Sequence, residues 1–279
     1  MKAIAKYRRR AKQVNSLLCL GLDSRPERLP PQFLQQANPL FAFNQHVIQR
    51  THESICAVKP NIAFYEAAGE AGLRSLRLTM EWLRETQPDL FTICDAKRAD
   101  IGSTSEAYAC AIFNNLGFDA VTLNPWLGRD ALEPFLGRDD KACIILCRTS
   151  NPGAGEFQDL EAKGRPLWQQ VARAVSLRWN DRNNCMLVMG ATSPAELAQA
   201  RQIVGDMPIL VPGVGAQGGD VAAVTRAGLD SQGGGLLINA ARSILYAPDP
   251  AEAARTLRDD INRERPAGTG DATSPQPLP

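Results

Sequence analysis

Charged side chains of both signs lie close together between residues 95 and 104, where an apolar segment ends. The preceding residues, Phe91 to Cys94, are apolar, rich in β-formers and too few for a stable helix, so they predict a buried strand. Because strand side chains repeat every second residue, Asp95 and Lys97 should point to the same side. Opposite charges this close perturb each other's pKa values, as acid–base and electrostatic catalysis requires. A solvated ion-pair network at a strand end is the alternative interpretation.

The residues after this charged pair predict a turn into a helix. Asp100 falls in the turn, and Ser103 or Thr104 is expected to be the N-cap. Glu106 would then lie in the first turn of a helix that runs to Asn115. The charges therefore cluster at a strand-to-helix connection.

Strand-like and helix-like segments alternate along most of the chain. Eight short segments, apolar on both faces, predict buried strands over residues 16–23, 55–60, 91–97, 120–124, 142–148, 185–189, 209–212 and 236–239. Helices are expected over residues 40–53, 67–86, up to 115, near 132, and over 166–180, 194–203, 220–227 and 251–264. Eight such units predict an α/β fold, a single (β/α)8 TIM barrel, with an extra N-terminal helix over residues 3–14. We expect the barrel to span residues 1–265. Residues 266–279, rich in Pro, Gly, Ser and Thr, predict a disordered tail.

Chemistry in such a barrel belongs at the carboxyl ends of the strands. Polar or glycine-rich residues at these ends are Asp23, Lys59, Asp95, Lys97, Asn124, Ser150, the loop 212–219 and Arg242. Each could be an ordinary solvated strand end, but their number favours a site. The glycines of loop 212–219 let backbone N–H groups approach an anion, and Arg242 can contact phosphate through two hydrogen bonds. Loops after the seventh and eighth strands are the usual phosphate site of this fold.

Composition excludes several other classes of protein. A net charge of +1 offers no general attraction to nucleic acid or anionic membranes. No apolar stretch is long enough to span a bilayer and no signal peptide is recognisable, so we expect a cytoplasmic protein. The seven cysteines are odd in number, and five of them lie in apolar strand-like runs, as small buried hydrophobes do. Neither the cysteines nor His46 and His52 have the spacing of metal ligands, so we expect no metal.

Several of these segments together resemble one known family. The run from Asp95 to Thr104, Asp-Ala-Lys-Arg-Ala-Asp-Ile-Gly-Ser-Thr, is similar to the signature of the orotidine 5′-phosphate decarboxylases. The likeness extends to Leu20–Asp23, Ala57–Asn61, Pro212–Gln217 and Arg242, and Thr51–Glu66 resembles the longer bacterial branch, called type 2. The end of the eighth strand reads Asn-Ala-Ala-Arg where shorter relatives tend to read Val-Gly-Arg.

The resemblance implies a carboxy-lyase that converts orotidine 5′-phosphate to uridine 5′-phosphate, the last step of de novo UMP synthesis, without a cofactor. It implies a catalytic array of Lys59, Asp95, Lys97 and Asp100, with Lys97 as proton donor to C6 of the pyrimidine. Asp100 would come from the partner subunit, so a homodimer with shared active sites is implied. The substrate-binding residues implied are Asp23, Thr104, Ser150, Pro212, Gly213, Gly215, Gln217 and Arg242. Asp23 would accept hydrogen bonds from the ribose, and Ser150 would contact the pyrimidine amide.

Two alternatives remain at this point. One is a related barrel lyase acting on a sugar phosphate, such as a hexulose-phosphate synthase, in which Mg²⁺ stabilises an enediolate through oxygen ligands. A site of that kind would place an acid at the end of the second strand, where this chain has Lys59. The other is a catalytically inactive barrel that binds phosphate and serves as a scaffold.

Overall fold

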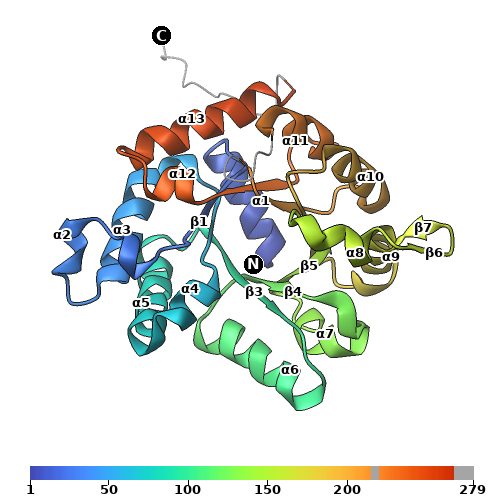
Figure 1. Ribbon diagram of the computed structural model, residues 1–279, viewed down its shortest axis with the longest axis horizontal. Coiled ribbons are helices and arrows are strands. Elements are labelled where there is room, and N and C mark those ends of the chain that lie inside the picture. The colour runs from blue at the N-terminus through green and yellow to red at the C-terminus, as the bar shows by residue number, and fades with distance from the viewer. Residues whose placement is uncertain (215–219, 267–279) are drawn as a thin grey trace, which may run out of the picture.

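Eight parallel strands form a closed barrel in the order β1-β10-β9-β8-β5-β4-β3-β2 (Figure 1). The computed structural model describes residues 1–214 and 220–266. The barrel strands are β1 (Leu18–Gly21), β2 (Ala57–Lys59), β3 (Phe91–Arg98), β4 (Ala120–Leu123), β5 (Ala142–Arg148), β8 (Cys185–Met189), β9 (Ile209–Pro212) and β10 (Leu236–Ala240). The prediction of a (β/α)8 barrel is confirmed. The tail predicted after the barrel lies, from residue 267 onward, outside the described residues.

Helices surround the barrel on the outside, apart from the first, which covers one of its ends (Figure 1). They are α1 (Ala3–Gln13), α2 (Pro31–Leu34), α3 (Pro39–Thr51), α4 (Ile62–Ala67), α5 (Gly69–Thr86), α6 (Gly102–Ala109), α7 (Arg129–Leu136), α8 (Gly155–Gln158), α9 (Leu167–Ala174), α10 (Pro194–Val204), α11 (Val221–Gly228), α12 (Arg242–Leu245) and α13 (Pro250–Arg263). Proline in the first turn starts α3, α10 and α13, where its missing N–H costs nothing. The helices predicted to end at Asn115 and Asn180 each finish in a π-helical turn, over Cys110–Asn115 and Val175–Trp179.

Two local features differ from the expectations. Helix α6 begins at Gly102, so the predicted N-cap at Ser103 or Thr104 is wrong, and both residues lie exposed inside the first turn. The Asp100 carboxylate accepts instead from the backbone N–H of Ile101 at 2.8 Å, which satisfies a donor ahead of the helix. A short antiparallel hairpin, β6 (Glu161–Ala162) and β7 (Arg165–Pro166), was also not predicted, because two-residue strands carry no periodicity.

The strands are buried on both faces, which explains their continuous apolar sequences. Five cysteines lie in these strands with almost no exposed surface, and burial raises the pKa of the Cys19, Cys94, Cys147 and Cys185 thiols to about 12. All seven cysteines are free thiols. The prediction that they act as small hydrophobes rather than as a disulfide framework is confirmed.

Helix α1 closes the amino-terminal end of the barrel (Figure 1). Tyr7 Oη donates to Leu236 O, at the start of β10, over 2.8 Å, and Lys6 Nζ pairs with Asp119 at 2.7 Å just before β4. Ala3 N donates to Asp140 O, two residues before β5. Because these contacts fall at the amino ends of three strands, the opposite end of the barrel is left for a site.

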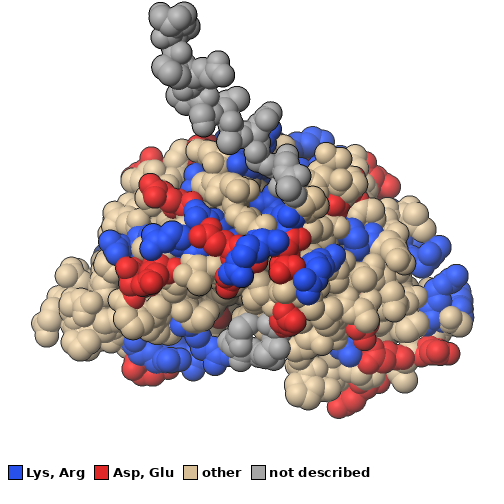
Figure 2. All heavy atoms as spheres, turned by 90° about the horizontal axis from the view of Figure 1, so that it is seen from above, with Lys and Arg blue, Asp and Glu red and all other residues tan. Residues whose placement is uncertain are grey.

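The outer surface carries charges of both signs. Figure 2 shows Lys and Arg interleaved with Asp and Glu over the face that includes α13, where Arg258 pairs with Asp259 and Arg226 with Glu264. On this face, such mixing produces no field of one sign for a nucleic acid to follow. Among the described residues, no helix is long and apolar enough to cross a membrane.

Shortening the Tyr7 side chain tests the contact between α1 and the barrel. Tyr7→Phe removes one buried hydrogen bond and should lower the free energy of unfolding by about 1 kcal/mol, measured by urea denaturation. Tyr7→Ala also leaves a cavity and should lower it by about 3–5 kcal/mol. The control is Leu177→Ala, at a side chain 68% exposed, which should change little. Equal losses for Tyr7→Ala and Leu177→Ala would contradict a sealing role for α1.

Candidate active site

A cavity of about 480 Å³ opens at the carboxyl end of the barrel. It brings together eight of the predicted site residues, namely Asp23, Lys59, Asp95, Lys97, Ser150, Pro212, Gly213 and Arg242. Asn61, Thr122 and Asn239 also line it and were not predicted. Asn124 does not: its side chain accepts from Trp126 N at 3.0 Å and caps a short turn. Gly215 and Gln217 lie outside the described residues.

One carboxylate holds two ammonium groups at the centre of this cavity. Lys59 Nζ lies 2.6 Å from Asp95 Oδ2, and Lys97 Nζ lies 2.7 Å from Asp95 Oδ1. Lys59 comes from β2 and the other two from β3, so two neighbouring strands supply the array. The prediction that Asp95 and Lys97 share a side is confirmed.

The array is charged although it is largely removed from water. Burial by itself would raise the pKa of Asp95, but Lys59 and then Lys97 outweigh it and hold that pKa well below the ordinary value. Burial would also lower the pKa of Lys59, which is 3% exposed, yet Asp95 and then Asp23 raise it. Asp95 and Lys59 are therefore both ionised at neutral pH. The side chain of Lys97 is half exposed, so its ammonium can meet a ligand in the cavity.

A bulge in β3 directs Lys97 into the cavity. The pairing of β3 with β4 shifts between Cys94 and Arg98, and Lys97 adopts a left-handed backbone conformation with φ 49°. Thr122 on β4 supports this conformation, because its Oγ1 accepts from Ala96 N at 3.0 Å and from Lys97 N at 2.9 Å. A left-handed lysine costs conformational energy, and such strain is typical of functional sites.

Thr122 also donates its hydroxyl proton to Asp95 Oδ1 at 3.0 Å. The hydroxyl thus uses its donor and its acceptors at once, and it joins the Asp95 carboxylate to the backbone of Lys97. The signal for it in the sequence is a single polar residue within the apolar run 120–123. Nothing in the sequence shows that this residue faces β3 rather than the helical layer.

Two acceptors at the edge of the cavity lack a donor within the described part of the chain. Asp23 Oδ1 and Asn239 Oδ1 are both buried without a hydrogen-bond partner there. Burial raises the pKa of Asp23, an effect that Lys59 opposes. Buried polar atoms are normally paired, so these two acceptors are suited to a ligand that brings hydroxyl donors.

A buried polar network holds the loop that carries Asp23. Asn44 on α3 accepts from Ser24 Oγ at 2.7 Å and donates to Tyr65 Oη at 3.0 Å, and Tyr65 Oη donates to Leu22 O at 3.0 Å. Ser24 is thereby bonded to α3 and Leu22 to α4, so the residues on both sides of Asp23 are held by helices outside the barrel. Neither Asn44 nor Tyr65 was predicted, because a polar residue within a helix carries no sign of its partners.

Asp100 and Thr104 lie outside this cavity in the single chain. Asp100 forms no ion pair with the described residues, and Thr104 is exposed on α6. Arg242 begins α12 directly after β10 and is exposed at the rim of the cavity. Within residues 1–214 and 220–266, no three His, Cys, Asp or Glu side chains are grouped as metal ligands.

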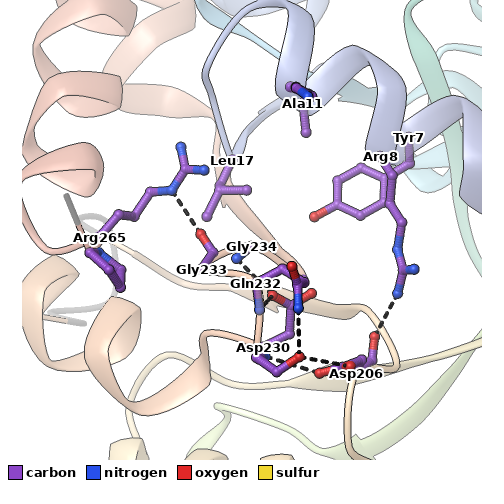
Figure 3. Close-up of a pocket in the computed structure, with 14 residues that line it drawn as sticks. Tyr7, Arg8, Ala11, Leu17, Asp206, Asp230, Gln232, Gly233, Gly234 and Arg265 are labelled. Atoms are coloured by element: carbon purple, nitrogen blue, oxygen red, sulfur yellow. Dashed lines mark hydrogen bonds between the residues drawn. The ribbon is translucent and has the colours of Figure 1, made fainter. Parts of the chain in front are cut away.

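A second cavity, of about 590 Å³, lies at the opposite end of the barrel beside α1 (Figure 3). Its carboxylates are already engaged by the loop that forms it: Asp230 accepts from Gln232 N and Gly234 N, and Asp206 accepts from Ser231. Arg265 donates to Gly233 O at 2.9 Å. These interactions stabilise the turn before β10, so the carboxyl end remains the candidate active site.

Neutralising Asp95 tests the energetics of the array. Asp95→Asn leaves the buried Lys59 ammonium without its counter-charge and should lower the free energy of unfolding by about 3–5 kcal/mol. The double variant Asp95→Asn/Lys59→Met removes both charges and should recover much of that loss in urea denaturation. Asp89→Asn, in an exposed pair with Arg9, is the control and should cost no more than about 1 kcal/mol. No recovery in the double variant would show that the pair is not coupled.

The same comparison has a defined pH dependence. Because the folded pKa of Asp95 is lowered, ionised Asp95 stabilises the native state above its unfolded pKa of about 4. The difference in free energy of unfolding between wild type and Asp95→Asn should therefore be largest at neutral pH. It should shrink as the pH falls toward the pKa of Asp95 in the folded protein. A difference that widens in acid would contradict this assignment.

Comparison with known proteins identifies the family. Residues 16–257 match the family model described as "Orotidine 5'-phosphate decarboxylase / HUMPS family". The orotidine 5′-phosphate decarboxylase of Cellvibrio japonicus is 49% identical over 260 residues, covering 90% of this chain and 94% of that protein. The structure of Leishmania donovani OMP decarboxylase superimposes with a TM-score of 0.85 at 37% identity, covering 95% of this chain and 99% of the other. Leishmania donovani UMP synthase gives a TM-score of 0.88 at 39% identity, covering 95% of this chain and 57% of that one. The chain belongs to the orotidine 5′-phosphate decarboxylase family.

Proposed function

We propose that this protein converts orotidine 5′-phosphate to uridine 5′-phosphate, the last step of UMP synthesis, without a metal or cofactor. The observation that carries the proposal is the Lys59–Asp95–Lys97 array at the centre of the carboxyl-end cavity. Relatives 44–49% identical over about nine-tenths of the chain are named as this decarboxylase, which supports the same reaction here.

Charge placement explains how such a reaction proceeds. When the bond between C6 and the carboxylate breaks, the electron pair stays on C6, and no neighbouring carbonyl can delocalise it. Preorganised charge lowers that barrier, because it requires no rearrangement as the negative charge develops. Lys97 supplies a positive charge beside C6 and then a proton, while carbon dioxide leaves.

Asp95 and Lys59 have supporting roles in this scheme. Asp95 holds both ammonium groups, and its charge lies beside the departing carboxylate of the substrate. Repulsion there would favour loss of carbon dioxide, and the same carboxylate keeps Lys97 in place. Lys59 is too deeply buried to act as the acid, so its role is to hold Asp95 ionised.

The cavity supplies contacts for the rest of the nucleotide. Asp23, with its buried acceptor, is suited to the ribose hydroxyls, and Asn239 offers a second acceptor nearby. Ser150 would contact the pyrimidine amide. The phosphate would bind between Pro212–Gly213 and Arg242, together with Gly215 and Gln217. Binding the remote phosphate then contributes to lowering the chemical barrier.

A metal-assisted sugar-phosphate lyase is the competing function, since the family description also includes HUMPS. That chemistry requires oxygen ligands for a hard cation. The end of β2 instead carries the ammonium of Lys59, which repels a cation and is already paired with Asp95. This observation favours decarboxylation.

A homodimer would complete the site with Asp100 of the second subunit. Asp100 lies beside Ile101, which is 64% exposed, and Trp126, 70% exposed, follows the neighbouring strand β4. Large apolar side chains exposed in this way are typical of subunit interfaces. Thr104, exposed on the same helix as Tyr108, would face the shared site from that interface.

A direct assay tests the reaction. Purified protein with orotidine 5′-phosphate and EDTA should lose the absorbance of the substrate's conjugated carboxyl-pyrimidine, at the rate seen without EDTA. Lys97→Ala should nearly abolish this loss, because the charge and the proton at C6 are removed together. Activity that EDTA abolishes and Mg²⁺ restores would overturn the metal-independent mechanism.

Mixing two inactive variants tests the shared site. Lys97→Ala and Asp100→Ala should each be nearly inactive, but mixed dimers contain one site with both lesions and one intact site. After subunit exchange at equal concentrations, activity should return to about a quarter of wild type, since half of the dimers are mixed and half of their sites are intact.

The matched control mixes Lys97→Ala with Lys97→Met, a pair that exchanges subunits but leaves a lesion in every site. Exchange itself is followed with differently tagged subunits. If the tags exchange and the Lys97→Ala and Asp100→Ala mixture stays inactive, Asp100 acts within its own subunit.

A further inference from the structure

Gln158, the last residue of α8, binds the segment that carries Ser150 at two points. Its Oε1 accepts from Thr149 N at 2.8 Å, and its Nε2 donates to Thr149 Oγ1 at 2.9 Å. Thr149 Oγ1 donates in turn to Asn151 Oδ1 at 2.6 Å. The residues on both sides of Ser150 are therefore connected to one carboxamide, which does not itself line the catalytic cavity.

An ion pair anchors this carboxamide to the barrel. Arg148, the last residue of β5, places its guanidinium against Asp159, with Nε 2.9 Å from Oδ1 and Nη2 3.0 Å from Oδ2. The Arg148 side chain is 13% exposed and that of Asp159 is 47% exposed, so water reaches the pair from the side of the carboxylate. Its Nη1 also donates to Thr149 O at 2.8 Å. Asp159 follows Gln158 directly, so the end of α8 is fixed to the end of β5.

Gly190, one residue beyond β8, packs closely against the backbone of Ser150. Its N–H donates to Arg148 O at 2.7 Å. A Cβ on Gly190 would lie 2.8 Å from both Cβ and N of Ser150 and 2.9 Å from its Cα. Gly190 is not among the glycines with positive φ, so lack of space rather than backbone conformation requires glycine here.

We propose that Gln158 and Gly190 are positioning residues that set the place of Ser150 against the base of the nucleotide. The proposal rests on the proposed function, in which Ser150 contacts the pyrimidine amide. A hydrogen bond to that amide is directional and weakens within a few tenths of an ångström, so a displaced Ser150 would lose it. Recognition of the base would thus depend on residues that do not touch it.

Inhibitor binding separates this role from general stability. Gln158→Leu should raise the inhibition constant of uridine 5′-phosphate about tenfold, as expected for one lost hydrogen bond. The inhibition constant of ribose 5-phosphate, which has no base, should stay unchanged. Gln158→Glu keeps an acceptor for Thr149 N and should have a smaller effect. Gly190→Ala should act as Gln158→Leu does, because its Cβ displaces the Ser150 backbone.

A double-variant comparison tests whether the effect passes through Ser150. In a Ser150→Ala background, Gln158→Leu should add nothing further to the inhibition constant of uridine 5′-phosphate. Gln169→Leu and Gly234→Ala are the controls. Gln169 bonds only to exposed Gln199 among the described residues, and a Cβ on Gly234 would make only ordinary van der Waals contact with Asp230, at 3.7 Å. Circular dichroism shows which variants fold, and Gly190→Ala or Gln158→Glu carries the test if Gln158→Leu does not.

Three outcomes are distinguishable. An effect confined to uridine 5′-phosphate and absent in the Ser150→Ala background supports the positioning role. Equal weakening of both inhibitors, or effects that add to Ser150→Ala, would overturn it. Failure of the wild-type protein to decarboxylate orotidine 5′-phosphate would instead overturn the proposed function.

Discussion

A single buried carboxylate, Asp95, holds two ammonium groups, and the arrangement of the site depends on it. An unpaired buried ion would be very costly, so Lys59 and Asp95 each need the other. Lys59 keeps Asp95 ionised, and Asp95 holds Lys97 at the surface of the cavity. The Lys59–Asp95 pair is strengthened by its burial, because few water molecules remain to screen it, whereas Lys97 is half exposed.

The backbone around Asp95 departs from a regular strand where it carries Lys97. An ordinary strand would continue its pairing through Lys97, but the bulge in β3 ends the regular register and turns that residue into a left-handed conformation. Thr122 stabilises the unusual backbone and donates to Asp95 at the same time. One hydroxyl therefore joins the backbone of β3 to the Asp95 carboxylate.

Polar groups at the two ends of the barrel differ in whether they are paired within the chain. At the amino end, Tyr7 on α1 donates to the backbone of β10, and Asp230 accepts from the loop around it. At the carboxyl end, Asp23 and Asn239 keep buried acceptors without donors in the described chain. Networks behind the site keep such groups in place, as Asn44 does for the loop of Asp23 and Gln158 for the segment of Ser150.

The sequence by itself determined the barrel and the charged residues that line the cavity. Apolar runs that alternate with amphipathic helices leave little choice of fold, and a parallel barrel places every strand end at one rim. Asp23, Lys59, Asp95, Lys97 and Arg242 could therefore be predicted as neighbours without any contact being known.

Only the tertiary structure decided which groups satisfy one another. The roles of Thr122 and Gln158 depend on partners elsewhere in the chain, and no periodicity reports such contacts. The N-cap of α6 was also predicted wrongly, because the helix begins at Gly102, directly after Ile101, and no side chain of the described residues caps it. Burial follows a periodic pattern that can be read along the sequence, whereas the partners of polar groups depend on which residues the fold brings close together.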